Sequence, residues 1–259
     1  MNILHTIILG IVEGVTEFLP ISSTFHLIWV SRFLGLPETD FTKLFNVVIQ
    51  SGAILAVVFL YWKEVLSNMR LFSKLIISFI PTALVGLFLY DYIKSVLFES
   101  VFGTTIVFIL VGVIFLGVEY LISRGKIKPM LDVEKLTYLQ AIGIGVFQAL
   151  AVVPGVSRAG AVLIGMMIFG FKRSESAKYS FMLSIPTISA ASLFDLLEMK
   201  DVITQHPDSA ITLLIGTAIA CVSAFIGIRW LIGYLQNHSL ALFGWYRVIF
   251  GILLLLFAR

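Results

Sequence analysis

The stretch EGVTEFLPISSTFH, residues 13–26, carries two carboxylates, two serines and a histidine inside an otherwise apolar run. Glu13 and Glu17 are four residues apart, so in a helix their side chains share one face about one turn apart. An ionised group in bilayer hydrocarbon costs about 2.5–3.5 kcal/mol on insertion scales, and such groups rarely persist without a task. Two carboxylates this close need a cation, a shared proton or a basic partner. The alternative is a structural pair bonded to a neighbouring helix.

A proline breaks this segment at Pro20 and suits the first turn of a new helix. Ser22 and Ser23 then lie at a helix start, where hydroxyls cap the amides and free N–H groups favour anions. His26 follows Ser23 by three residues, so the imidazole and the hydroxyl can touch. A hydroxyl beside a base is the minimum for an activated nucleophile, although a single histidine in such a run is often only interfacial.

The second half of the chain carries a cation in the motif PGVSRAG. Arg158 is the only charged residue of segment 138–171, it follows a Pro–Gly break, and Ser157 precedes it. A guanidinium at a helix start, together with exposed amides, makes a phosphate site with bidentate geometry. Gly155 could open the backbone to that ligand, although close helix packing is the commoner use of glycine in membranes. In the simpler alternative, Arg158 only neutralises the glutamate pair; both roles can coexist.

These groups together predict a metal-assisted phosphate site. Arginine and amides attract an anion, whereas carboxylates repel it unless a divalent cation lies between them. Oxygen ligands of this kind suit Mg²⁺ or Ca²⁺, which Glu13 and Glu17 would hold. The expected ligand is a phosphate or diphosphate whose tail lies in lipid. The prediction requires Arg158 to meet Glu17 and Ser23 in one cavity that solvent can enter.

The composition identifies a polytopic membrane protein. Of the 259 residues, 59% are hydrophobic and 13% are charged, against about 25% charged residues in soluble domains, and the mean hydropathy is +1.03. The single cysteine, Cys221, excludes a disulfide framework, and basic residues in short loops argue against nucleic acid. Apolar runs of about 20 residues suit helices that cross a bilayer. The predicted spans are 44–62, 75–90, 103–122, 177–198, 210–235 and 244–258.

An internal repeat relates GIVEGVTEFLPISST, residues 10–24, to GVFQALAVVPGVSRA, residues 145–159. Each reads as a helix rich in small residues, then a proline, then a serine three residues later. This pattern matches Ser23 with Ser157, and one gap brings Glu13 opposite Gln148. A second apolar helix and three longer spans follow each copy. The sequence therefore predicts two repeats, 1–122 and 138–259, in one membrane domain.

Three spans in each half make the two copies run in opposite directions across the membrane. Loops 63–74, 123–137 and 172–178 hold ten basic residues, whereas the alternate loops hold Arg32, Lys43, Lys94 and Lys200. The positive-inside rule assigns the first set to the cytoplasm. Segments 3–35 and 138–171 must then be re-entrant hairpins that enter from opposite faces. The predicted fold is all-α, with six transmembrane helices plus two re-entrant hairpins. The alternative, one kinked span for each segment, gives eight crossings and basic loops on both faces.

At these residues the sequence resembles the undecaprenyl-pyrophosphate phosphatase family, the integral-membrane type linked to bacitracin resistance. The E-x-x-x-E motif of that family matches Glu13 and Glu17, and its histidine after a double serine matches His26. Its P-G-x-S-R motif matches residues 154–158, and FNVVIQSGAILAVV, residues 45–58, resembles its first full span. The resemblance covers essentially the whole chain.

The resemblance implies removal of the terminal phosphate of undecaprenyl diphosphate, which gives the monophosphate carrier of cell-wall synthesis. It implies a divalent-metal enzyme of the bacterial plasma membrane, with an inverted-repeat fold and an active site on the outer, periplasmic face. The expected partners are the polyprenyl diphosphate and membrane lipid, with a homodimer left open. The implied roles are metal or catalytic for Glu13 and Glu17, nucleophile for Ser23, acid/base for His26, and substrate binding for Ser22, Gly155, Ser157 and Arg158.

Two departures from the family motifs concern the phosphate side. The usual R-S-G-A-T reads R-A-G-A-V here, so Ala159 and Val162 lack the expected hydroxyls, and Phe25 stands where a glycine commonly precedes the histidine. Two lost hydroxyls would weaken phosphate binding by about 1 kcal/mol each. Because the glutamates and Ser23 are intact, we expect activity to survive.

A transporter or lipid flippase is the alternative function, since inverted repeats with glutamates near the midplane also describe ion-coupled carriers. The Ser23–His26 pair favours an enzyme, because a carrier needs neither group. The sequence leaves open whether serine, histidine or water attacks the phosphorus.

Overall fold

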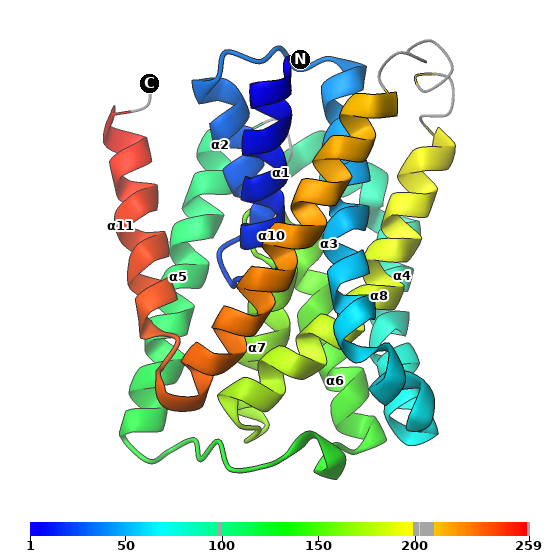
Figure 1. Ribbon diagram of the computed structural model, residues 1–259. Coiled ribbons are helices and arrows are strands. Elements are labelled where there is room, and N and C mark those ends of the chain that lie inside the picture. Colours follow the sequence, from blue (N-terminus) through cyan, green and yellow to red (C-terminus); the bar gives the residue numbers. More distant parts are fainter. Residues whose placement is uncertain (98–99, 199–201, 203–209, 258–259) are drawn as a thin grey trace.

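The computed structural model describes residues 1–97, 100–198, 202 and 210–257, without the side chains of 89–97 (Figure 1). Of the basic residues predicted for the outer loops, the Lys94 side chain and Lys200 lie outside this description. The helices are α1 Ile3–Phe18, α2 Ser23–Phe33, α3 Asp40–Ser67, α4 Met69–Leu97, α5 Val101–Ser123, α6 Tyr138–Ala149, α7 Arg158–Ile168, α8 Arg173–Glu198, α10 Ala210–Asn237 and α11 Ala241–Phe257, with short 3₁₀ turns η1 Val133–Lys135 and η2 Leu150–Val152.

Every regular element in the described ranges is a helix, which confirms the predicted all-α class. Five helices, α3, α4, α5, α8 and α10, are long and apolar enough to cross a bilayer, and they contain five of the six predicted spans. Helix α11 is apolar but has 17 residues. It contains the sixth predicted span, 244–258, apart from residue 258, which lies outside the described residues.

The remaining four helices form two hairpins. In Figure 1, α1 runs from the upper end of the molecule toward its middle and α2 returns to that end, whereas α6 and α7 do the same from the lower end. These helices are short, with 16, 11, 12 and 11 residues. The two hairpin turns therefore meet near the middle of the molecule.

The hairpins break at equivalent positions of the chain. Helix α7 begins and ends 135 residues after α2, and α6 begins 135 residues after α1. Ser22 precedes α2 with φ 68° and Ser157 precedes α7 with φ 76°, and no other non-glycine residue in the described ranges has positive φ. The backbone thus aligns Ser22 with Ser157, and it aligns Glu13 with Gln148 without a gap. The match of Ser23 with Ser157 is wrong by one residue, because the prolines occupy different positions in the two turns.

Side-chain caps determine where several helices begin. The side chains of Asn2, Thr39 and Ser100 accept hydrogen bonds from backbone amides of the first turns of α1, α3 and α5. Thr137 and Gln140 form a capping box at the start of α6. Each cap of this type contributes about 1 kcal/mol.

Close helix packing holds the first hairpin in place. A Cβ on Gly14 of α1 would collide with the Ala220 carbonyl and the Ser223 hydroxyl of α10. One turn earlier, a Cβ on Gly10 would lie 2.9 Å from the Gly216 carbonyl oxygen. The GxxxG spacing of Gly10 and Gly14 therefore lets the two backbones touch.

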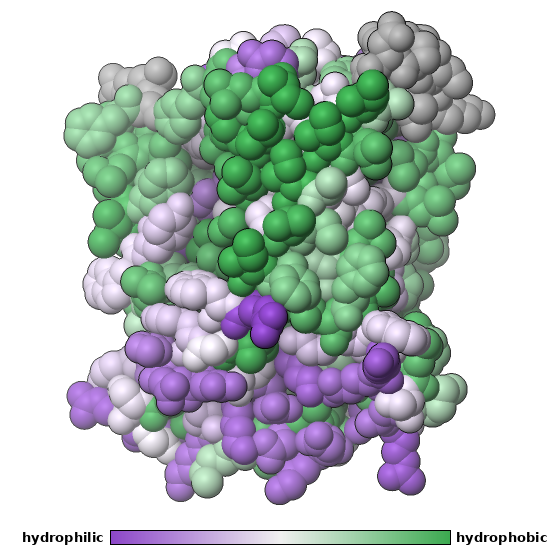
Figure 2. Space-filling model, in the orientation of Figure 1, coloured by the Kyte–Doolittle hydropathy of each residue, from purple (hydrophilic) through white to green (hydrophobic). Residues whose placement is uncertain are grey.

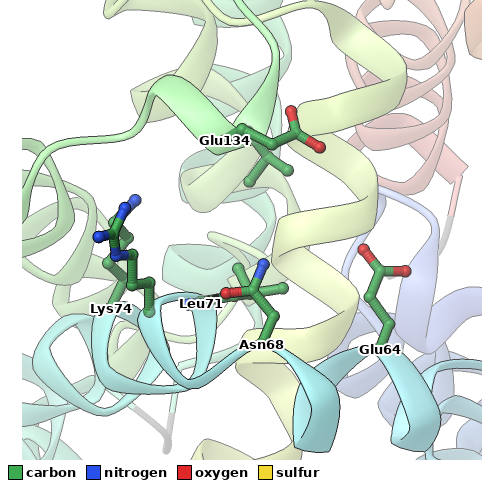
Figure 3. A pocket seen from close by; sticks show the side chains of 7 residues that line it. Glu64, Asn68, Leu71, Lys74 and Glu134 are labelled. Carbon is green, nitrogen blue, oxygen red and sulfur yellow. Dashed lines mark hydrogen bonds between the residues drawn. The ribbon is translucent and has the colours of Figure 1, made fainter.

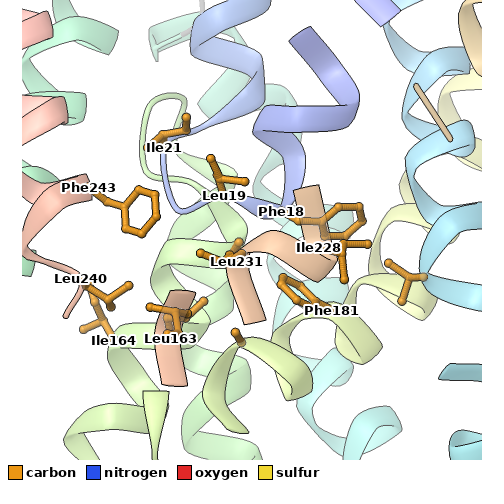
Figure 4. Close-up of a cluster of buried hydrophobic side chains, with 14 of the residues drawn as sticks. Phe18, Leu19, Ile21, Leu163, Ile164, Phe181, Ile228, Leu231, Leu240 and Phe243 are labelled. Atoms are coloured by element: carbon orange, nitrogen blue, oxygen red, sulfur yellow. The ribbon is translucent and has the colours of Figure 1, made fainter. Parts of the chain in front are cut away.

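An apolar cluster surrounds the turn between α1 and α2 (Figure 4). It takes side chains from the turn itself, from α3 and α5 of the first half, and from α7, α8, α10 and α11 of the second half, so helices from both halves enclose the hairpin tip. Its labelled members are Phe18, Leu19, Ile21, Leu163, Ile164, Phe181, Ile228, Leu231, Leu240 and Phe243.

One end of the molecule is polar, and the surface above it in Figure 2 is mostly apolar. The three loops predicted to be cytoplasmic lie together at this end. A Lys178 Nζ–Glu64 Oε1 ion pair of 2.7 Å joins α8 to the end of α3. A Lys172 Nζ–Asp132 Oδ1 pair of 2.6 Å, with a backbone bridge from Leu131 to Phe171, joins loop 124–137 to the start of α8.

We expect Gly14→Ala to lower stability by about 1–3 kcal/mol, the usual cost of overpacking, because the added methyl group meets backbone atoms of α10. Thermal unfolding in detergent measures the change. Gly117→Ala on α5 is the matched control, since its Cβ meets no atom within 4 Å. Equal unfolding temperatures for the two variants would contradict the contact.

Candidate active site

Glu17 joins the two hairpins through a buried hydrogen-bonded chain. The Ser23 hydroxyl donates to Glu17 Oε2, and Arg158 Nη2 donates to Glu17 Oε1 over 2.7 Å. Only 9% of the Glu17 side chain and 11% of the Arg158 side chain are exposed. The structure therefore brings together Glu17, Ser23 and Arg158, as the sequence predicts, and Arg158 neutralises Glu17. The expected solvent-filled opening is nearly closed.

The two helix starts hold the ends of this chain. Ser23 is the first residue of α2 and Arg158 the first residue of α7, and each follows a serine with left-handed backbone. A non-glycine residue in that conformation costs about 1–3 kcal/mol, and such strain is typical of functional sites. Ser157 accepts a hydrogen bond from the Gly160 amide, whereas the Ser22 side chain caps nothing. The amides at the start of α2 thus lack a side-chain cap, and a helix N-terminus of this kind suits an anion.

Glu13 lies one turn before Glu17 on α1 and is completely buried. Neither of its carboxylate oxygens has a hydrogen-bond partner among the described residues. A buried ionised carboxylate without a partner is strongly unfavourable. Glu13 therefore needs a proton or a cation.

Arg158 keeps part of its hydrogen-bonding capacity free. Its Nη1 donates to the Ser180 carbonyl of α8 over 2.9 Å, whereas its Nε is buried without a partner. The Ser180 hydroxyl is also buried and unpartnered. The Phe18 ring lies under the guanidinium at 5.7 Å. Arg158 Nε and the Ser180 hydroxyl are therefore two donors that no other described residue uses.

His26 does not make the expected contact with Ser23. Its Nδ1 lies 2.8 Å from the Ser22 carbonyl oxygen and its Nε2 lies 2.7 Å from the Tyr246 hydroxyl. A carbonyl oxygen can only accept, so Nδ1 carries the proton, and in the neutral ring Nε2 accepts from Tyr246. The ring also stacks on Tyr246 at 5.8 Å. In this arrangement Glu17, and not His26, accepts the hydrogen bond of the Ser23 hydroxyl.

The other predicted ligand residues occupy the turn of the second hairpin. Gly155 has φ 92°, and a Cβ there would lie 2.6 Å from the Thr104 carbonyl oxygen of α5, so close packing explains this glycine.

Ala159 and Val162 are completely buried in apolar clusters. Phe25 stacks on Phe108 at 3.9 Å. The family hydroxyls are therefore replaced by core packing, and the weakened phosphate binding expected from their loss stays a prediction.

The donor set fits a divalent cation only in part. The described residues contain no cluster of three or more Asp, Glu, His or Cys side chains suited to a metal. Both Glu17 oxygens already have partners, while both Glu13 oxygens are free. Mg²⁺ and Ca²⁺ take about six or more oxygen ligands and often use waters and substrate phosphates. The residues thus fit a cation whose coordination a phosphate ligand completes.

Sequence reasoning missed Ser180, Tyr246 and Arg247. Ser180 and Tyr246 look like ordinary members of spanning helices, and they reach the site only through the fold. Arg247 carried a signal, since it is the one charge within the predicted span 244–258.

A cavity of about 300 Å³ lies at the polar end, away from these residues. Glu64, Asn68, Leu71, Lys74 and Glu134 line it (Figure 3). Side chains of both charges share its wall, which favours no single ligand. The candidate site is therefore the Glu17 cluster at the hairpin turns.

Comparisons with known proteins give one consistent result. The family model described as bacitracin resistance protein BacA matches residues 6–253. A protein of Persephonella marina named undecaprenyl-diphosphatase is 45% identical over 257 residues, covering 99% of each chain. Proteins of the same name from Bdellovibrio bacteriovorus and Aquifex aeolicus are each 40% identical, covering 99% and 96% of this chain and 96% and 95% of their own.

We expect Arg158→Met to destabilise the protein by about 3–5 kcal/mol, because it leaves Glu17 buried without its cation. The double variant Glu17→Gln/Arg158→Met should be more stable than the sum of the single effects. Thermal unfolding of the four proteins in detergent gives the coupling. Lys178→Met, which breaks a more exposed pair, is the control and should change stability by about 0–1 kcal/mol. Purely additive effects would show that the Glu17–Arg158 contact carries no energy.

Proposed function

The chain belongs to the bacitracin resistance protein BacA family, and we propose that Glu13, Glu17, Ser23 and Arg158 form the site of its phosphatase reaction. The relatives named undecaprenyl-diphosphatase match nearly the whole chain. The protein therefore removes the terminal phosphate of undecaprenyl diphosphate and leaves undecaprenyl phosphate. These relatives do not favour a carrier or flippase.

The observation that carries the site assignment is the chain from Ser23 through Glu17 to Arg158. It is the place where a hydroxyl, a base and a guanidinium meet. The free Arg158 Nε and the Ser180 hydroxyl, both buried without partners, supply further donors for the terminal phosphate. The uncapped amides of α2 add partial positive charge on the other side.

Ser23 is the proposed nucleophile. Its Oγ forms a bond to the terminal phosphorus while the bond from that phosphorus to the bridging oxygen breaks, and undecaprenyl phosphate leaves. The serine proton passes to Glu17 Oε2, which already accepts the Ser23 hydrogen bond. Water then attacks the phosphorus of the phosphoserine, the bond from phosphorus to Ser23 Oγ breaks, Oγ takes back the proton from Glu17, and phosphate leaves with the protons of the water. Arg158 binds the equatorial oxygens, where charge develops in the transition state.

His26 is proposed as a positioning residue in place of the acid/base role that the family resemblance implies. Its Nδ1–H holds the Ser22 carbonyl, and Ser22 is the strained residue that aims Ser23. The Tyr246 hydroxyl bonds to the other ring nitrogen and so holds the ring in the orientation that makes this bond.

A divalent cation, Mg²⁺ or Ca²⁺, is the proposed cofactor. Glu13, with its two free oxygens, would hold it, and Glu17 lies one turn away. Bound there, the cation supplies charge that neutralises the diphosphate oxygens. This explains why a carboxylate without a partner persists in the interior.

The proposed membrane arrangement has six crossings, α3, α4, α5, α8, α10 and α11, and two re-entrant hairpins. The hairpin helices have at most 16 residues, fewer than the roughly 17–25 that a crossing needs. The polar end with its basic loops would face the cytoplasm of a bacterial inner membrane (Figure 2). The α1–α2 hairpin then opens to the outer face, from which the diphosphate would enter.

We expect Ser23→Ala and Glu17→Gln each to lower phosphate release from undecaprenyl diphosphate by about 10³-fold or more, because they remove the nucleophile and its base. His26→Gln should cost only about 10–100-fold, since an amide can still donate to the Ser22 carbonyl. Phosphate release by the purified proteins measures all three. If His26→Gln is as inactive as Ser23→Ala, histidine is the base and the assignment to Glu17 is wrong.

We expect EDTA to reduce activity by at least about 100-fold and added Mg²⁺ or Ca²⁺ to restore it, because the diphosphate charge is otherwise unneutralised. Glu13→Gln should raise the metal concentration for half-maximal activity at least about tenfold. Calorimetric titration of Ca²⁺ into the protein, without substrate, should show weaker binding to this variant. Glu198→Gln at the end of α8 is the control. Unchanged Ca²⁺ binding in Glu13→Gln would remove Glu13 from the metal site.

A further inference from the structure

Arg247 of α11 is a completely buried cation that the proposed chemistry does not use. No ion pair joins it to a carboxylate among the described residues. Its guanidinium instead donates to three backbone carbonyls: Nε to Phe108 over 3.0 Å, Nη1 to Pro20 over 3.1 Å, and Nη2 to Gly155. A buried charge that bonds only to backbone is costly in a membrane interior and indicates a task.

Two of the three carbonyls belong to equivalent positions of the two hairpin turns. Pro20 lies two residues before the strained Ser22, and Gly155 lies two residues before the strained Ser157. The next residues beyond those serines are Ser23 and Arg158, which both bond to Glu17. One guanidinium thus connects the turns that carry the nucleophile and the phosphate-binding arginine.

The guanidinium is held rigidly in this place. It lies 4.4 Å from the Phe108 ring centroid and 5.6 Å from that of Phe115. Helix α5 leaves room for it at Gly112, where a Cβ would lie 2.8 Å from Arg247 Cβ. Arginine suits the position because its planar fork presents several donors at fixed angles, which a lysine ammonium does not.

We propose that Arg247 is a positioning residue that clamps the turn of the first hairpin to the turn of the second and so keeps Ser23 and Arg158 on Glu17. The proposal rests on the proposed function of these three residues. Arg247 itself is proposed to touch no substrate, since its side chain is completely buried and each of its three nitrogens already donates to a carbonyl. Its loss should therefore change the geometry of the reaction and not the binding of the diphosphate.

The kinetic test compares Arg247→Met and Arg247→Lys with the wild type on undecaprenyl diphosphate. We expect kcat to fall about 100-fold in Arg247→Met, the effect of a misplacement of about 1 Å, with KM unchanged. In Arg247→Lys, which keeps the charge and can reach one carbonyl, kcat should fall less. Arg229→Met is the matched control, because that exposed guanidinium lies 5.5 Å from the Phe225 ring on α10, outside the site.

The distance test separates a clamp from a general loss of stability. Spin labels at Phe33→Cys on α2 and Ile168→Cys on α7, both exposed positions, in a Cys221→Ser background, report the distance between the hairpins. We expect a narrow distribution in the parent and a broadened one with Arg247→Met. Labels at Phe59→Cys on α3 and Leu214→Cys on α10, also exposed, should show no change.

An unchanged hairpin distribution in Arg247→Met, or full activity in that variant, would overturn the proposal. A broadening equal for both label pairs would also overturn it, because it would indicate general loosening. Failure of the proposed function looks different: Ser23→Ala would stay active while the Arg247 variants still separate the hairpins. If Arg247→Met does not fold, Arg247→Lys carries both measurements.

Discussion

The structure depends on the burial of one carboxylate, Glu17, between a hydroxyl and a guanidinium that lie 135 residues apart in the chain. In a low-dielectric interior, a carboxylate without a counter-charge is strongly unfavourable. The two halves must therefore approach until Arg158 reaches Glu17. Each half alone would leave a buried charge unpaired, so the same contact that assembles the site also couples the halves.

Broken helices make this contact feasible. A continuous helix would satisfy every amide internally, whereas a break at the middle of the molecule exposes a helix start. Here two breaks lie face to face, each with a left-handed serine that costs about 1–3 kcal/mol. Arg247 bonds to a carbonyl of each break, and the apolar cluster around Phe18 and Phe181 encloses the first turn. Irregular backbone is tolerated at this depth because protein surrounds it.

Much of this arrangement was readable from residue types. Apolar runs predict the five long helices, each of which contains its predicted span and extends beyond it by up to seven residues at an end. The cost of a charge in hydrocarbon singles out Glu13, Glu17 and Arg158. Two predictions were wrong: the orientation of the His26 side chain and the alignment of the two hairpin turns. Spacing alone brings His26 near Ser23, but the ring turns to Ser22 and Tyr246, and Tyr246 lies 220 residues away. No local pattern reports such a partner. Alignment on the prolines put the two turns out of register by one residue, because the equivalent positions are the serines with positive φ, Ser22 and Ser157.

The two hairpins share one backbone conformation but carry different residues at equivalent positions. Glu13 corresponds to Gln148, and Ser23 to Arg158, in hairpins with matching boundaries. Gln148 donates to Thr82 over 2.9 Å and accepts from Thr187, so a neutral amide is satisfied by local hydroxyls. Glu13 has no such partners. Because an unsatisfied buried group costs about 1–3 kcal/mol or more, the Glu13 carboxyl needs a proton or a cation, which the Gln148 amide does not. The two hairpins therefore differ at this position: hydroxyls satisfy the amide of the second hairpin, whereas the first hairpin holds an acid without a partner beside Glu17, which Arg158 of the second hairpin neutralises.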